Sequence, residues 1–189
     1  MPTRNAPETR RRILAAATED FAGRGIAGAR VDRIAAVAGV NKAQIYAYFG
    51  DKQALFDAVY RRHAAAIVDE TPFTVDDLPG YAVGLYDAAQ RRPDVIRLLA
   101  WARLEGVDVP MDADAVRDKL AAIAAAQAHG RLDATGSPED VLALVNAAAL
   151  SWSAVGLSPV GEADHDRRRA ALRHVVTQAF GGPGEPGAC

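Results

Sequence analysis

The chain has 189 residues, half of them apolar, with a formal net charge of −2 and a single cysteine, Cys189. This length accommodates one compact domain or a small domain joined to a medium one, and one cysteine excludes a disulfide scaffold or a cysteine metal site. The longest apolar run, near residues 141–150, is interrupted by Asn146 and is too short to span a bilayer. The first residues, MPTRNAPETRRR, lack the apolar core of a secretory signal. We therefore expect a soluble cytoplasmic protein.

Charge is distributed unevenly along the chain. Residues 1–63 carry eleven Lys or Arg and six Asp or Glu, which gives this part a net charge of +5. The remaining residues carry eleven Lys or Arg and eighteen Asp or Glu, which gives −7. Such asymmetry is typical of a chain in which one part binds a polyanion and the other does not. Chance clustering of charge on a solvated face is the alternative explanation.

A composition rich in Ala and poor in aromatic residues favours an all-α fold. The spacing of apolar residues predicts four helices in the N-terminal part, over about 7–23, 31–38, 42–49 and 52–69. Gly39 and Val40 supply the turn between the second and third helices, and Asn41 is placed to cap the third. The apolar residues of this region can share one small core: Val31, Ile34, Ala35, Ala38, Val40, Ile45 and Phe49.

The segment 31–49 has the layout of a helix-turn-helix, in which the second short helix enters the major groove of DNA. Arg10, Arg11 and Arg12 crowd the first turns of the preceding helix, where the helix dipole disfavours positive charge. This arrangement indicates either a phosphate partner or a merely solvated basic turn.

The C-terminal part is also predicted to be helical. Pro72, Pro79 and Gly80 interrupt the helical pattern, and we place the junction between the two parts of the fold there. The helices expected beyond it cover about 81–91, 94–106, 113–129, 138–155 and 163–180. The helix over 138–155 is apolar nearly all round, so we expect it to be buried on most sides. The tail, residues 181–189, is expected to be disordered.

A group of markers in the N-terminal part resembles the DNA-binding domain of the TetR family of bacterial transcriptional repressors. The resemblance covers about residues 10–60. The remainder of the chain resembles the family only in its length, its number of helices and a Trp-bearing middle helix. The markers follow one another in the family's order: Phe21 and Gly25, Ile34-Ala35, Ala38-Gly39-Val40, Tyr46 and Phe49, and Lys52 and Leu55.

The resemblance implies an all-α protein with two functional domains. Residues 1–52 would form the helix-turn-helix DNA-binding domain with its N-terminal arm, and residues 53–180 a helical effector-binding and dimerisation domain. It also implies a homodimer, joined through the last two helices, that binds a palindromic operator on double-stranded DNA. A small-molecule effector would release the DNA, with no cofactor and no enzymatic activity. The two recognition helices of such a dimer must lie about one helical turn, ~34 Å, apart.

Base contacts are expected from the first turn of the helix over 42–49. Lys42, Ala43 and Gln44 occupy this turn, where side chains reach base edges. A glutamine can bind adenine through two hydrogen bonds, and a lysine can meet guanine or a phosphate. For Gln44, the alternative is a polar surface residue with no base contact.

Phosphate contacts are expected nearby. By the same resemblance, Tyr48 offers its hydroxyl to a phosphate, while Tyr46 packs partly against the domain core. Lys52 matches a phosphate-contacting position at the positive end of the next helix.

Two positions depart from the family's pattern. The family often has Thr or Ser just before the helix over 31–38, where this chain has Ala29 and Arg30. The absence of a side-chain cap costs about 0.5–2 kcal/mol in comparable helices, and Arg30 is a candidate to replace the lost hydroxyl by pairing with a phosphate. Ala47 stands where family members often carry a larger residue, which indicates fewer contacts from the recognition helix.

An effector pocket between helices should be mostly apolar with a few polar groups. Asn146 lies in an apolar helix, where a buried amide needs a partner: a ligand, the other subunit or a backbone carbonyl. The tryptophans are alternatively core or dimer-packing residues, and Glu105 is alternatively solvated. The candidates are Tyr86, Trp101, Glu105, Asn146 and Trp152.

The sequence also bears on two other function classes, an enzyme and an adaptor. The sequence contains no Ser/His/Asp arrangement, no phosphate-binding glycine loop and no histidine cluster with metal-ligand spacing, so we do not expect an enzyme or a metal site. The second alternative is a helix-turn-helix adaptor or DNA-binding protein without an effector. Release of DNA by a small molecule would separate this adaptor from a ligand-responsive regulator.

Overall fold

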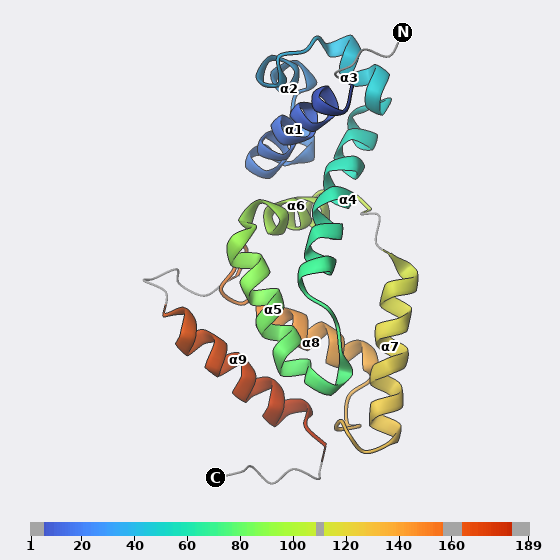
Figure 1. Cartoon of the computed structure of the whole chain (residues 1–189), viewed down its shortest axis with the longest axis vertical. Coiled ribbons are helices and arrows are strands. Elements are labelled where there is room, and N and C mark those ends of the chain that lie inside the picture. Colours follow the sequence, from blue (N-terminus) through green and yellow to red (C-terminus); the bar gives the residue numbers. More distant parts are fainter. Residues whose placement is uncertain (1–5, 109–111, 157–163, 183–189) are drawn as a thin grey trace. The chain divides into compact units, whose positions relative to one another are not determined.

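The computed structural model describes residues 6–108, 112–156 and 164–182 (Figure 1). Within these ranges the regular elements are nine α-helices and one short 3-10 helix, η1, and the only bridge is an isolated one between Leu132 and Gly181. The prediction of an all-α fold is confirmed. Among the described residues, no helix is both long and apolar enough to cross a membrane.

The chain forms two compact units, and the first is discontinuous in sequence. Unit 1 comprises residues 1–66 and 92–110, and unit 2 comprises residues 67–91 and 111–189. The sequence-based domain division at residue 52 stays a prediction. Unit 1 holds α1 (Ala6–Gly28), α2 (Val31–Ala38), α3 (Lys42–Phe49), most of α4 (Lys52–Glu70) and α6 (Pro93–Leu104). Unit 2 holds η1 (Val75–Asp77), α5 (Leu78–Arg91), α7 (Ala113–Ala128), α8 (Pro138–Leu150) and α9 (His165–Phe180).

The core of unit 1 is built by apolar side chains from all five of its helices. The rings of Phe21 on α1 and Phe56 on α4 pack edge to face with their centroids 5.4 Å apart. Gly39 ends α2 in the left-handed conformation (φ 63°), and the Val40 N–H then donates to Ala35 O at 3.0 Å. Fully buried members of this core are Ile13, Phe21, Ile34, Ile45, Leu55, Phe56, Val59 and Leu98.

Helix α1 runs further than its sequence indicated. We expected it to end at about Gly23, through Gly23 and Gly25, and its regular part does end at a break at Gly25 (φ 74°, ψ 175°), after which a short helical segment continues to Gly28. The backbone groups that the break leaves open are bound by Trp101 of α6 and by Glu105, the residue after α6. Their geometry is described below.

Unit 2 is a bundle in which α5 packs against both α8 and α9. Its α8 is more exposed than predicted. It is also shorter, since the helix ends at Leu150 instead of about Val155. Val141, Val145 and Ala149 form its buried stripe, whereas the Leu144 side chain is 57 % exposed. One chain therefore covers only one face of this apolar helix.

The structure also differs from the prediction at the start of α5 and at the C-terminal end. Pro79 and Gly80 lie in the first turn of α5 instead of interrupting the chain before it. At the C-terminal end, Gly181 and Gly182 are held by the bridge to Leu132 and by a hydrogen bond to Arg131 O at 3.1 Å. The rest of the tail predicted to be disordered, residues 183–189, lies outside the described residues. So does residue 163, where the last helix is predicted to begin.

Candidate nucleic-acid interface

Helix α3 projects most of its side chains away from the core of unit 1. Of its eight residues, which the structure describes in full, Ile45 alone is buried. Lys42, Ala43 and Gln44 are all exposed in its first turn. This short helix is anchored in the core by Ile45, with Tyr48 and Phe49 packed partly against it, and the rest of its surface is open to a partner.

The start of α3 is fixed by a reciprocal capping box. The Gln44 N–H donates to Asn41 Oδ1 at 2.8 Å, and the Asn41 N–H donates to Gln44 Oε1 at 3.1 Å. The predicted cap at Asn41 is confirmed. The side-chain oxygen of Gln44 is occupied by this box, so base reading through both ends of the amide requires the side chain to leave the box. Its base contact stays a prediction.

The two tyrosines of α3 differ in burial from what the sequence predicted. The Tyr46 residue is 41 % exposed, whereas Tyr48 is half-buried and packs against the core of unit 1. Helical periodicity explains the difference, since residues three and four positions after Ile45 lie on its buried face and the next residue does not. The expectation that Tyr46 packs against the core was wrong. The phosphate contact of Tyr48 stays a prediction.

The lysine at the start of α3 already has a partner on α2. Lys42 Nζ donates to Asp32 Oδ2 at 3.0 Å, and both side chains are exposed. The hydrogen bond and the negative charge of Asp32 raise the pKa of Lys42 above its usual value. Asp32 is not among the site residues predicted from the sequence, although its place in the first turn of the helix before the recognition helix is a usable signal.

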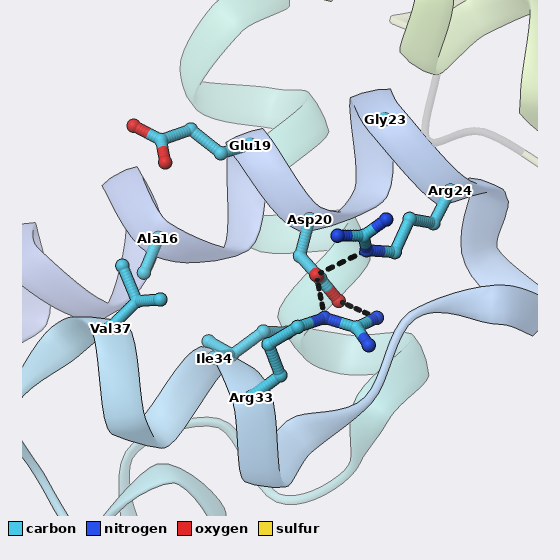
Figure 2. Close-up of a pocket in the computed structure, with 8 residues that line it drawn as sticks. All are labelled: Ala16, Glu19, Asp20, Gly23, Arg24, Arg33, Ile34 and Val37. Atoms are coloured by element: carbon cyan, nitrogen blue, oxygen red, sulfur yellow. Dashed lines mark hydrogen bonds and ion pairs between the residues drawn. The ribbon is translucent and has the colours of Figure 1, made fainter.

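The missing side-chain cap of α2 is replaced by a residue from α1. The backbone N–H of Arg30 donates to Asp20 Oδ2 at 3.0 Å, and Arg33 and Arg24 surround the same carboxylate (Figure 2). Burial would raise the pKa of Asp20, but hydrogen bonds from Arg33 and the Arg30 amide, with the charges of Arg33 and Arg24, lower it below its usual value. No local pattern points to Asp20, because it acts ten residues before the cap.

This carboxylate lies in a small groove between α1 and α2. The groove has a volume of about 220 Å³ and is shown in Figure 2. Its polar part is the Asp20 cluster, and its apolar part includes Ile34 and Val37. The arginines here neutralise an internal carboxylate, so the groove is a structural feature of the helix-turn-helix.

The predicted phosphate contacts at Arg30 and Lys52 differ in their surroundings. The Arg30 side chain is exposed at the start of α2. The Lys52 side chain is half-buried, and its Nζ donates to Ala27 O at 3.4 Å and to Ala29 O at 3.3 Å. Both roles stay predictions, and for Lys52 a phosphate must compete with these carbonyls or share the ammonium group with them.

Two residues predicted to bind an effector lie at the break in α1. The Glu105 carboxylate accepts hydrogen bonds from the backbone N–H groups of Ile26 and Ala27, at 3.0 and 2.7 Å. The Trp101 Nε1–H donates to Ala22 O at 3.2 Å. These residues belong to unit 1, whereas the other three candidates belong to unit 2.

Of the candidates in unit 2, Tyr86 and Trp152 meet. Their ring centroids are 6.0 Å apart in an edge-to-face arrangement, and the buried Tyr86 hydroxyl lies 2.6 Å from His165 Nδ1. Asn146 Oδ1 is buried and has no hydrogen-bond partner among the described residues. That unsatisfied oxygen agrees with the need for a partner inferred from the sequence.

A cavity of unit 2 lies away from these candidates. It has a volume of about 540 Å³ and lies between η1, the loop after α7 and the end of α9. None of the five predicted effector residues lines it. Within the described part of the chain, no group of three or more His, Cys, Asp or Glu is arranged to hold a metal ion.

Comparison with known proteins covers both parts of the chain. The family described as "Bacterial regulatory proteins, tetR family" matches residues 13–59, and "Tetracyclin repressor-like, C-terminal domain" matches residues 77–180. The HTH-type transcriptional repressor SCO4008 of Streptomyces coelicolor is 37 % identical over 161 residues, which cover 82 % of this chain and 83 % of the relative. The HTH-type transcriptional regulator RutR of Escherichia coli is 32 % identical over 106 residues, covering 53 % of this chain and 50 % of its own.

Solved structures show the same similarity. The crystal structure of the transcriptional regulator SCO4942 from Streptomyces coelicolor shares 40 % sequence identity with this chain and superposes with a TM-score of 0.78. The match covers 93 % of this chain and 99 % of that one. A gamma-butyrolactone receptor, at 20 % identity and a TM-score of 0.67, shares the fold and covers 94 % of this chain and 90 % of its own.

Proposed function

The chain belongs to the TetR family of bacterial regulatory proteins, and from this premise we propose that it is a repressor that binds a palindromic operator as a homodimer and is released by a small molecule. Membership of the family makes it a helix-turn-helix transcriptional regulator and not an enzyme. Its target being bacterial DNA, we expect it to act in the cytoplasm.

The observation that carries the proposal is the exposed first turn of α3. Helix α3 is anchored in the core through Ile45 and presents Lys42, Ala43 and Gln44 to the outside. This is the part of a recognition helix that reaches base edges in the major groove. The remaining candidates for DNA contact are Arg30, Tyr46, Tyr48 and Lys52.

The exposed apolar residues of α8 and α9 support a homodimer. Leu144 on α8 is 57 % exposed and Val175 on α9 is 53 % exposed in the single chain. Apolar side chains in the last two helices of a bundle provide a surface that a second copy can cover. Such a dimer presents two copies of α3, which a palindromic operator requires.

The proposal of repression is supported by a relative, and the proposal of release by an effector is supported by groups in unit 2. The relative SCO4008 is named a transcriptional repressor, and its alignment includes most of both chains. In unit 2, the unsatisfied Asn146 oxygen and the Tyr86–Trp152 pair are the groups best suited to bind an effector. Trp101 and Glu105 are weaker candidates, because their polar atoms already bind α1.

The direct test is recovery of the genomic DNA fragments that the purified protein binds, followed by footprinting. We expect a palindromic site whose half-sites are about one helical turn apart and whose affinity falls steeply with salt. Binding with no sequence preference, or protection of a single half-site by a monomer, would contradict the proposal. Small molecules related to the products of neighbouring genes then serve as candidate effectors, and failure of every ligand to release DNA would favour the adaptor alternative.

Two variants tie the binding to α3. Gln44→Ala should weaken operator binding by a factor of about 5–150, the effect of one lost base contact of 1–3 kcal/mol. Lys42→Ala should weaken it and, if the contact is to phosphate, reduce the salt slope by about 0.9. Arg117→Ala is the charge-matched control for Lys42→Ala, because Arg117 is exposed on α7 in unit 2. Equal effects of Lys42→Ala and Arg117→Ala would remove Lys42 from the interface.

A further inference from the structure

The C-terminal end of α6 is bound to the break in α1, and we propose that Glu105 is a positioning residue that sets the orientation of the DNA-reading helices. The inference rests on the proposed DNA-binding function and assigns Glu105 a part in it. Glu105 was a candidate for effector binding by sequence. Its geometry points to the backbone of α1 instead.

The break at Gly25 leaves identifiable backbone groups open. In a continuous helix the N–H of Ile26 would donate to Ala22 O, and the N–H of Ala27 would donate to Gly23 O. The backbone of Gly25, at φ 74° and ψ 175°, interrupts both hydrogen bonds. Ala22 and Ile26 are buried, and an unpaired C=O or N–H group in a buried residue is costly, so a partner is required there.

Helix α6 and the residue that follows it supply these partners. Glu105 Oε1 accepts from the Ile26 N–H at 3.0 Å, Glu105 Oε2 accepts from the Ala27 N–H at 2.7 Å, and Trp101 Nε1 donates to Ala22 O at 3.2 Å. Two oxygens of one carboxylate on two consecutive N–H groups hold the segment in both position and angle. Because the acceptor is charged, these hydrogen bonds are stronger than neutral ones.

The approach is close enough to require glycine at the break. A Cβ atom on residue 25 would lie 2.3 Å from Glu105 Oε1 and 2.9 Å from the Trp101 ring. The approach of Glu105 and Trp101 to α1 therefore depends both on the left-handed backbone of Gly25 and on its lack of a side chain. We name Gly25, Trp101 and Glu105 the α1–α6 junction.

The segment held by the α1–α6 junction leads directly into the helix-turn-helix. Its last residue in α1 is Gly28, and α2 begins at Val31. Between them, Ala27 O and Ala29 O accept from Lys52 of α4, and the Arg30 N–H donates to Asp20. The start of α2 is thus held by Asp20 of α1, and the segment before it by Lys52 of α4 and by Glu105; α3 packs on α2.

Orientation matters for operator binding more than for other DNA. A binding constellation must be held within about 0.5 Å and 10–20° to make its directed contacts. Non-specific binding depends on charge and tolerates such changes. Loss of the Glu105 hydrogen bonds should therefore lower affinity for the operator and leave affinity for unrelated DNA in place.

The test compares full-length wild type with Glu105→Gln on the recovered operator and on a shuffled fragment of the same length. The variant keeps the shape of the side chain but loses its charge and one of the two acceptor oxygens. We expect operator affinity to fall about tenfold with little change for the shuffled fragment, and amide exchange at Ile26 and Ala27 to accelerate. Glu19→Gln is the charge-matched control, because Glu19 is an exposed carboxylate on α1.

A second variant guards against simple unfolding. Trp101→Phe keeps an aromatic ring but removes the N–H that binds Ala22 O together with part of the ring surface, so it should lower the operator-to-shuffled affinity ratio in the same direction. An unchanged ratio in Glu105→Gln overturns the inference, as does an equal fall on both DNAs together with a lower melting temperature. If wild type itself shows no preference for any fragment, the proposed function fails before this comparison begins.

Discussion

At the scale of single residues, the recognition helix carries a cation that is already paired. Lys42 and Asp32 form an ion pair across 3.0 Å, with side chains 48 % and 73 % exposed. Exposed pairs of this kind contribute about 0–1 kcal/mol to stability. The consequence for DNA is larger, because Asp32 places a negative charge beside the group that would meet a phosphate or a guanine.

We predict that Asp32→Asn increases DNA affinity generally. Removing this carboxylate leaves Lys42 without its internal counter-charge, so one more counterion should be displaced on binding and the salt slope should steepen by about 0.9. Thermal stability should change by no more than about 0.5 kcal/mol. Fluorescence anisotropy over a salt series measures both, with Glu19→Gln as a control. An unchanged slope would mean that Asp32 lies away from the DNA.

A second residue-scale feature is the bond between α1 and α4 at His63. Thr18 Oγ1 donates its proton to Leu14 O at 2.8 Å and lies 3.0 Å from His63 Nε2. Since the hydroxyl proton is used, the histidine must donate through Nε2 to complete the pair. The ring is half-buried, so a second proton on it is unfavourable in the folded chain.

Acidification should therefore destabilise the protein partly through His63. Burial lowers its pKa below the ordinary 6.5, with contributions from the charges of Arg62 and Arg92 that outweigh Asp94. The unfolded chain then binds the proton more tightly, so stability falls as pH drops below about 6.5 until the lower pKa of the folded state is reached. In melting curves from pH 8 to 5, His63→Gln should lose less stability than wild type. His129→Gln, at an exposed position, should behave as wild type.

At the scale of elements, local chemistry predicted the helix-turn-helix and the interruption of α1 at its glycines, but not the short helical segment that follows Gly25. Gly39 and Asn41 act through their own backbone or near neighbours, so the turn and the cap could be read from sequence. The segment of α1 after Gly25 is held by Glu105, which is distant in sequence. Neither this segment nor the role of Glu105 could therefore be predicted from local sequence. For the same reason, the cap of α2 by Asp20 carried no sequence signal.

The break in α1 yields a matched pair of substitutions. Gly25→Ala should destabilise the protein by about 2–4 kcal/mol, from the left-handed backbone and from overlap of the new Cβ with Glu105 and Trp101. Gly23→Ala should be neutral or stabilising by up to about 1 kcal/mol, because a Cβ there meets nothing within 4 Å and the residue is helical. Denaturant unfolding midpoints compare the two. Equal midpoints would refute the geometry at Gly25.

At the scale of the whole molecule, α8 is apolar as the sequence shows, but the prediction that one chain buries it on most sides was wrong. The sequence does not distinguish burial within one chain from burial between two, and Leu144 is exposed in the single chain. The effector candidates share this difficulty, because packing between distant helices decides which of them meet. Tyr86 and Trp152 do meet, whereas Trp101 and Glu105 bind α1.

The proposed dimer leads to a prediction at this scale. Leu144→Glu should convert the dimer to a monomer, because a charge in an apolar interface is costly to bury, and operator affinity should fall with it. Light scattering coupled to gel filtration measures the mass. Leu104→Glu is the control, since Leu104 is 78 % exposed but lies on α6 in unit 1. A Leu144→Glu variant that remains dimeric would place the interface on another surface.

The discontinuity of unit 1 has a consequence for biosynthesis. Residues 1–66 leave the ribosome first, but Leu98, fully buried in their core, and Glu105, which binds α1, are translated only after residues 67–91. The nascent N-terminal part must wait for α6 before its core can close. A polypeptide released early, after residue 66, should therefore melt at a lower temperature and less cooperatively than the full chain in circular dichroism. A prematurely terminated message would then yield no stable competitor for the operator.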